Sequence, residues 1–258
     1  RLAAAYDLEA ERALHEGLLP AGVYGRAERN RHLGTLRAWA EKLEGLRDEF
    51  PLAEVHRFGA AVAEGPLDAV HAPLVVEARV RGEVRRIAIS GATRPLLPAS
   101  GRSLEFAYGL GRERHFLRLF LDRALLAALE LTPAATPWRA VVVPSPWSKP
   151  LLERRYAALE PAAARIWLAE RAAELLGAPH AYLLSGDLAL ACLRGKRSHE
   201  EGLAGLLREA RDQDRSIRDR WGVVTRWRDL EPPAQAEALA RRRWRAYVEA
   251  RLPEGGES

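Results

Sequence analysis

The sequence has one cysteine and no methionine among its 258 residues. Cys192 therefore cannot form an internal disulfide, and its apolar neighbours predict a buried, inert thiol rather than a nucleophile. Such cysteine usage is typical of the reducing cytoplasm. The chain starts at Arg1 without the features of a signal peptide, so we expect a piece of a longer cytoplasmic protein.

Several other sequence features that would define a function class are missing. No apolar run approaches the ~20 residues that a membrane helix needs, so no membrane partner is expected. Gly109 and Gly111 begin a Gly-x-Gly pattern that is not completed, and no phosphate-binding loop is present. The seven histidines show no ligand spacing. We therefore expect no metal and no cofactor in this domain.

The composition is that of a globular protein, with 48% hydrophobic and 29% charged residues. The net charge is +5 and the sequence pI is about 9.7. A basic excess is compatible with a phosphate-backbone partner. The excess is small beside the charges that cancel, and arginine-rich usage also follows from a GC-rich genome, so the charge alone does not assign a partner.

The periodicity of the apolar residues predicts a mixture of helices and strands. Spacings of three and four predict helices at 6–15, 24–47, 112–131, 161–176, 199–215 and 232–251. Two-residue alternation predicts a largely antiparallel meander of strands at 54–58, 74–80, 84–89 and 103–108. Two further strands are expected at 138–143 and 180–184, and the continuous apolar run of the first predicts that it is buried.

These elements predict an α/β or α+β fold, in which helices flank a mixed sheet. We expect one domain over residues 1–252, followed by a disordered tail at 253–258. Its parts are a helical hairpin at 1–50, a sheet with a helix at 51–150, and an extension of helices and a strand at 151–252.

Three stretches of the sequence resemble a known family. Residues 16–25 read Glu-Gly-Leu-Leu-Pro-Ala-Gly-Val-Tyr-Gly and lead into a long helix. Residues 89–94 are followed by Leu104-Glu105-Phe106, and a late helix carries Trp244, Arg245 and Tyr247 after the elements at 161–184. Together they resemble the C-terminal region of RecC, the gamma subunit of the RecBCD helicase–nuclease (exonuclease V). This resemblance implies a restriction-endonuclease-like core.

Working nucleases of that fold carry Gly-x-Ile-Asp on one strand and Asp-Tyr-Lys-Thr-Gly on another. Two carboxylates there hold a divalent cation, and the lysine helps to position the attacking water. The corresponding stretches here place Arg94 at the metal-binding aspartate, keep one carboxylate as Glu105, and place Ala107 at the lysine. A shifted alignment, using residues 82–86, also places an arginine at the aspartate. The resemblance therefore implies a catalytically degenerate domain.

Two groups of residues are candidates for binding. An exposed aromatic residue can stack on the bases of single-stranded DNA while nearby cations contact its phosphates. On this basis we predict DNA binding by Trp147, Lys149, Arg194, Lys196 and Arg197. Partner-subunit contacts are predicted for Trp221, Trp227, Arg242, Trp244 and Arg245. The alternatives are packing of Trp147 under its loop, solvated basic faces, and tryptophans that belong to the core.

The resemblance implies a noncatalytic DNA-handling and scaffold domain in double-strand-break repair and recombination. Its partners would be RecB-like and RecD-like subunits and the end of a DNA duplex with its single strands, while those subunits use ATP and Mg. One alternative is an active metal-dependent nuclease, in which Glu77 or Glu83 converges with Glu105. Another is a purely protein-binding module.

Overall fold

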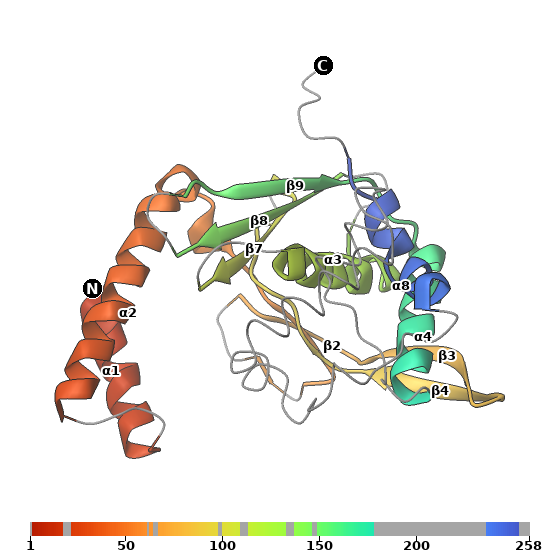
Figure 1. Cartoon of the computed structure of the whole chain (residues 1–258), viewed down its shortest axis with the longest axis horizontal. Helices are drawn as coiled ribbons and strands as arrows, with labels where there is room; N and C mark the ends of the chain where they lie inside the picture. The colour runs from red at the N-terminus through yellow and green to blue at the C-terminus, as the bar shows by residue number, and fades with distance from the viewer. Residues whose placement is uncertain are drawn as a thin grey trace.

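The computed structural model describes residues 2–17, 22–60, 62–63, 67–97, 100–108, 113–132, 137–145, 149–177 and 236–252. The structure is mixed α/β, with helices flanking mixed β-sheets (Figure 1). The expected strand at 180–184, the helix at 199–215 and the tail at 253–258 lie outside the described residues. No helix in the described ranges is long and apolar enough to cross a membrane.

Two helices form the predicted hairpin, which projects from the body of the molecule in Figure 1. They are α1 (Leu2–His15) and α2 (Gly22–Lys42), followed by the short 3-10 helices η1 (Glu44–Leu46) and η2 (Phe50–Leu52). The hairpin is held partly by polar contacts: the Arg29 guanidinium donates two hydrogen bonds of 2.6 and 2.7 Å to Asp7, and the Tyr6 hydroxyl lies 2.8 Å from His32 Nδ1.

The central sheet has four strands in the order β6-β7-β8-β9. They are β6 (Leu96–Leu97), β7 (Arg102–Ala107), β8 (Trp138–Pro144) and β9 (Leu152–Tyr156). Strands β7 and β8 run parallel, with helix α3 (Glu113–Ala128) connecting them, while β6 and β9 are antiparallel to their neighbours. Six of the seven residues of β8 are buried, which confirms the buried strand predicted from its apolar run.

The other strands form two small sheets. One has the order β2-β1-β5 and contains β1 (His56–Phe58), β2 (Ala69–His71) and β5 (Gly91–Ala92). The other is an antiparallel ribbon of β3 (Leu74–Val80) and β4 (Glu83–Ile89), referred to below as the β3–β4 ribbon.

The predicted single meander is therefore wrong, because its four strands are divided among three sheets. Only the pairing of 74–80 with 84–89 is present. Strand β7 is covered on both faces, with Leu104 against Leu46 and Val141 and with Ala107 in the core that α3 fills. Alternation in a sequence shows which side chains share a face of a strand, but it does not specify the neighbouring strand.

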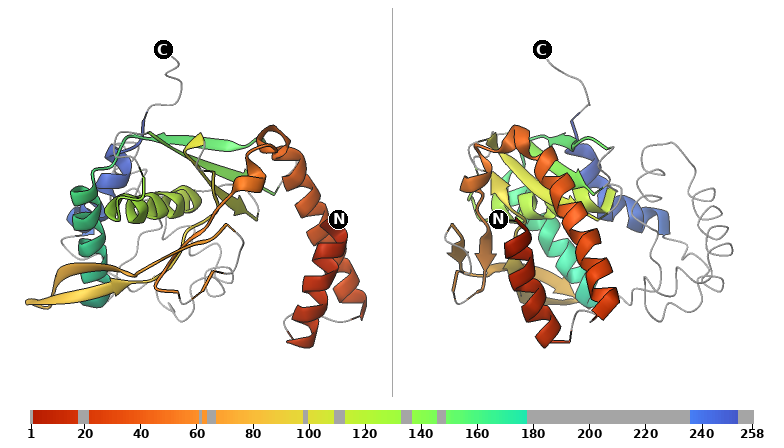
Figure 2. Two further views of the ribbon diagram at one scale, coloured as in Figure 1. Left: turned by 180° about the vertical axis from the view of Figure 1, so that it is seen from behind. Right: turned by 90° about the vertical axis from the view of Figure 1, so that its left-hand side faces the viewer.

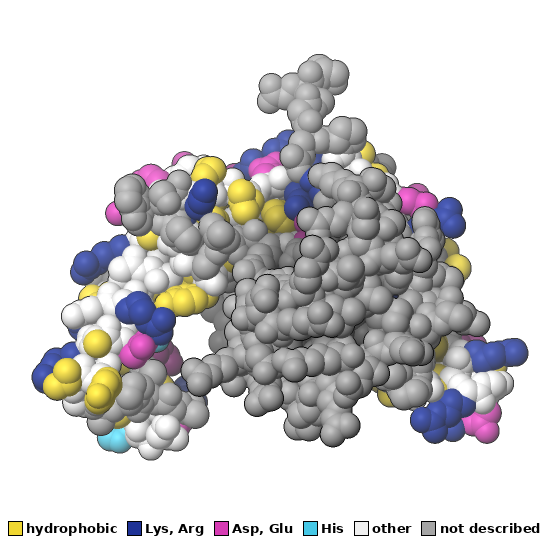
Figure 3. Space-filling model, in the orientation of Figure 1, with side chains coloured by type: hydrophobic (Ala, Val, Ile, Leu, Met, Phe, Trp, Pro, Cys, Tyr) yellow, Lys and Arg dark blue, Asp and Glu magenta, His cyan; other side chains and the backbone are white. Residues whose placement is uncertain are grey.

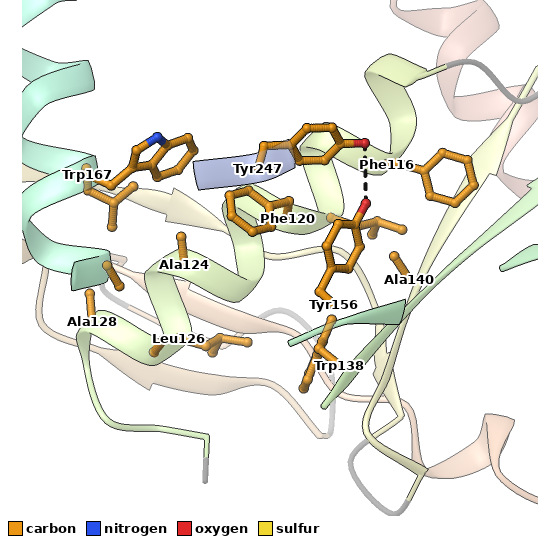
Figure 4. Packing of buried hydrophobic residues seen from close by; sticks show 14 of the residues in the cluster. Phe116, Phe120, Ala124, Leu126, Ala128, Trp138, Ala140, Tyr156, Trp167 and Tyr247 are labelled. Atoms are coloured by element: carbon orange, nitrogen blue, oxygen red, sulfur yellow. Dashed lines mark hydrogen bonds between the residues drawn. The ribbon is translucent and has the colours of Figure 1, made fainter. Parts of the chain in front are cut away.

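Helix α3, which the sequence predicted as a helix at 112–131, is the centre of the main core. Its Phe120 ring contacts the rings of Tyr156, Trp167 and Tyr247 at centroid distances of 5.3 to 5.5 Å (Figure 4). Trp167 belongs to α4 (Pro161–Gly177) and Tyr247 to α8 (Ala236–Glu249), two helices that the sequence also predicted. The core therefore joins the C-terminal helix to the central sheet.

A network of polar side chains completes this contact. The Tyr247 hydroxyl donates to Glu113 Oε1 at 2.7 Å and lies 3.3 Å from the Tyr156 hydroxyl (Figure 4). The Arg154 guanidinium forms a 2.5 Å ion pair with Glu113 and lies 3.8 Å from the centre of the Phe116 ring. These polar groups are satisfied within the core, as buried polar groups must be.

The β3–β4 ribbon is closed by a two-residue turn at Arg81 and Gly82. The φ angles there are 51° and 89°, and Val80 pairs directly with Glu83, as in a type I′ hairpin. Glycine adopts such angles freely, whereas a left-handed conformation costs another residue such as Arg81 about 1 kcal/mol. Figure 2 shows the ribbon extending beyond α4.

We expect Tyr247→Ala to lower the free energy of unfolding by about 3–5 kcal/mol, because it removes a buried ring and a partner of Glu113. Tyr247→Phe keeps the ring and should cost about 1–2 kcal/mol. Tyr24 is 78% exposed, so the control Tyr24→Ala should change stability by less than about 0.5 kcal/mol. Urea unfolding measures all three, and equal stabilities of Tyr247→Ala and Tyr24→Ala would contradict the proposed anchoring of α8.

Candidate functional site

The candidate site is centred on Glu105, a buried carboxylate on β7. Its Oε2 atom lies 2.5 Å from Nε of Arg94, which follows β5 in the chain. The side chain of Glu105 is 6% exposed and that of Arg94 is 37% exposed, so the ion pair lies at the edge of the core. The structure thus brings together the two residues that the resemblance to RecC implied at the metal-binding positions of a nuclease.

Helix α3 adds three polar residues to the site that the sequence reasoning did not identify. His115 Nδ1 and an Arg118 guanidinium nitrogen lie 3.5 and 3.8 Å from Glu105 Oε1. Asp122 Oδ2 accepts a 2.8 Å hydrogen bond from the backbone N–H of Arg94. The spacing of three and four between these residues places them on one side of the helix, beside its apolar face. This polar stripe is the sequence signal that would have identified them.

Burial changes the protonation of two groups at the site. It raises the pKa of Asp122 to about 7, against the opposing effect of the Arg94 N–H and charge. It also lowers the pKa of His115, although the neighbouring Glu105 carboxylate favours the charged form. Two arginines and a neutral imidazole thus surround Glu105 near neutral pH.

Ala107 ends β7 in the core and is fully buried. Its methyl group supplies no charge, and its carbonyl oxygen accepts a 2.9 Å hydrogen bond from the backbone N–H of Ser145. Ala107, which the resemblance placed at the lysine position of working nucleases, is therefore a packing residue in this fold.

The carboxylates proposed as partners of Glu105 in an active nuclease do not lie with it. Glu77 and Glu83 are exposed on the β3–β4 ribbon, in a different sheet, and Glu83 pairs with Arg85 at 2.8 Å. Asp122 is the second carboxylate that the fold brings to the site. Among the described residues, no group of three or more His, Cys, Asp or Glu side chains has an arrangement that would hold a metal ion.

The other sequence-predicted residues are only partly described. Lys149 is exposed after β8. On α8, Arg242 and Arg245 are exposed, whereas Trp244 is half-buried with its ring 6.4 Å from that of Tyr247. The remaining predicted residues lie outside the described ranges, namely Trp147, Arg194, Lys196, Arg197, Trp221 and Trp227.

The inner side of α8 is held by charge as well as by packing. Arg243 Nε lies 2.5 Å from Glu174 of α4, and Arg171 of the same helix donates a 3.0 Å hydrogen bond to the carbonyl of Arg242. Arg245 forms an exposed pair with Glu249 one turn away. Among the side chains of this helix that the structure describes, those of Arg242, Arg245 and Glu249 are exposed.

Comparison with known proteins does not assign this site. No protein-family model matches the sequence, and no curated protein matches it.

Asp122 should make stability depend on pH. Its folded pKa of about 7 exceeds an unfolded value near 4, so the folded state binds the extra proton and stability falls as the pH rises through 7. Asp122→Asn keeps an acceptor for the Arg94 N–H but does not titrate. Relative to this variant, the unchanged chain should lose on the order of 1–3 kcal/mol between pH 5 and pH 8 in urea unfolding.

Asp7→Asn is the matched control for this measurement. A hydrogen bond from Arg29 lowers the pKa of Asp7, so its titration lies below pH 5 and its effect on stability should be constant from pH 5 to pH 8. If the difference between Asp122→Asn and the unchanged chain is also constant over this range, Asp122 is not the titrating group.

Proposed function

We propose that this chain is a noncatalytic DNA-handling and scaffold domain of a bacterial RecBCD-type helicase–nuclease, acting in double-strand-break repair. The sequence resemblance to the C-terminal region of RecC suggests the family and a restriction-endonuclease-like core. The observation that carries the noncatalytic assignment is the ion pair of Arg94 with Glu105.

A divalent cation at Glu105 would compete directly with the guanidinium of Arg94. Mg²⁺ binds oxygen ligands in a near-octahedral shell. Here the permanently charged guanidinium of Arg94 already lies 2.5 Å from the Glu105 carboxylate. Arg118 adds a second positive charge 3.8 Å away. Repulsion by two cations in a partly buried site opposes metal binding more strongly than it would in water.

The parts of the molecule that face outward support the DNA-handling and scaffold roles. The exposed Lys149 is a candidate for phosphate contact, and the basic residues at 194–197, which lie outside the described ranges, are candidates from the sequence alone. Figure 3 shows apolar side chains exposed on the projecting α1–α2 hairpin. Leu8, Val23 and Tyr24 are among the exposed apolar residues of this hairpin. This hairpin and the outer side of α8 are candidate surfaces for the RecB-like and RecD-like partners, whose motors would use ATP and Mg.

The test is release of acid-soluble fragments from linear double-stranded and single-stranded DNA, with Mg²⁺ or Mn²⁺ and with a chelator control. We expect no chelator-sensitive cleavage by the chain. We also expect binding to a forked duplex that weakens as salt is added, because phosphate contacts release counterions.

Glu105→Gln provides the control for a contaminating nuclease. Cleavage that disappears in Glu105→Gln, while circular dichroism shows the variant to be folded, would overturn the noncatalytic assignment. Failure to bind forked or single-stranded DNA at low salt would instead favour a purely protein-binding module.

A further inference from the structure

We propose that the tip of the β3–β4 ribbon binds the phosphate backbone of double-stranded DNA. Eight residues at the tip, 79–86, include four arginines and one glutamate, whereas the whole chain has a net charge of only +5. Figure 3 shows charged side chains gathered where the ribbon projects. The inference rests on the proposed DNA-handling function and assigns the contact to residues that this function did not include.

The arginines of the tip are exposed, and most lack an acidic partner. Arg85 pairs with Glu83 at 2.8 Å, and both side chains are at least 60% exposed. Arg79, Arg81 and Arg86 are exposed and form no ion pair within the described part of the chain, although Arg86 lies opposite Glu77 in the strand register. Three guanidinium groups are thus available to an external anion.

The backbone at the tip indicates that the charge of Arg81 has a role outside folding. Arg81 occupies the first central position of a type I′ turn, with a φ angle of 51°. Asparagine and glycine adopt this conformation with less strain than arginine, and strained residues concentrate at functional sites. Stability alone would favour another residue at this position.

The geometry of the ribbon fits an extended polyanion. Residues 81–86 form a continuous exposed stretch, and the register places Arg79 and Arg86 on the same face of the ribbon with Arg81 at its end. Arg79 pairs with Val84, so Arg86 is its diagonal neighbour across the two strands, and such neighbours are about 7–8 Å apart. This pair, together with Arg81 at the turn, can contact neighbouring backbone charges of a duplex without reading its bases.

The same surface lacks what a protein partner would need. Protein interfaces depend on aromatic and large apolar side chains that fill pockets on the partner. Val84 is the one large apolar side chain among the exposed residues at 79–86. Nucleic-acid interfaces are more polar and more positively charged, which is the character of this tip.

The test compares two triple variants with the same change in net charge. The ribbon variant is Arg79→Gln, Arg81→Gln and Arg86→Gln, and the control is Arg12→Gln, Arg26→Gln and Arg47→Gln, whose three side chains are exposed on α1, on α2 and after η1. Binding of a fluorescent blunt duplex is titrated at several salt concentrations. The ribbon variant should bind roughly 10-fold more weakly, with a salt slope reduced by about 2–3, and the control should lose much less.

Arg81→Asn separates a binding role from a structural one. Asparagine suits the turn, so this variant should have a higher urea midpoint than the unchanged chain while binding DNA more weakly. A merely structural arginine would not show these opposite changes.

The outcomes separate the two proposals. If the unchanged chain binds DNA and the ribbon variant loses no more affinity than the control, the ribbon assignment is wrong and the proposed function stands. If the unchanged chain does not bind duplex or forked DNA at low salt, both are wrong. Binding only to vesicles with acidic lipids, or only to an acidic protein, would also overturn the ribbon assignment.

Discussion

The orientation of helix α3 about its own axis determines both the core and the candidate site. One side of its 16 residues places Phe116, Phe120 and Ala124 in the core, and the neighbouring side directs His115, Arg118 and Asp122 toward Arg94 and Glu105. A shift of one residue turns an α-helix by about 100° and would exchange these sides. The rings of Trp167 and Tyr247, which pack on Phe120, therefore hold the geometry of a polar site that they do not touch.

The two buried carboxylates near helix α3, Glu113 and Glu105, each lie beside an arginine. Glu113 in the first turn of α3 pairs with Arg154 and accepts from Tyr247, and Glu105 on the adjoining strand pairs with Arg94. A carboxylate at a helix N-terminus is also favoured by the helix dipole. Losing one partner of such a pair leaves an uncompensated buried charge, which is much more costly than the net contribution of the pair. These contacts therefore restrict how β7, β9, α3 and α8 can be arranged, even where they add little to stability.

The long elements could be predicted from the sequence because their periodicity is local. Helices α3 and α4 and strand β8 have apolar patterns that depend only on their own residues. The short strands β2, β6 and β9 and the parallel pairing of β7 with β8 depend on contacts with distant segments, and a pattern within one segment does not contain that information. For the same reason, motif comparison identified Arg94 and Glu105, whereas Asp122 became part of the site only through the packing of α3.

The inner site and the outer ribbon differ in how their charges are compensated. Around Glu105, the guanidinium groups of Arg94 and Arg118 both lie beside the same buried carboxylate. At the tip of the β3–β4 ribbon, three exposed arginines have no such partners among the described residues, and one of them holds a strained backbone conformation. Under the proposed function, DNA would therefore be held on a surface that projects from the core rather than at the position of the nuclease centre. Under this proposal, metal chemistry and DNA handling depend on different residues, so the second would not require the first.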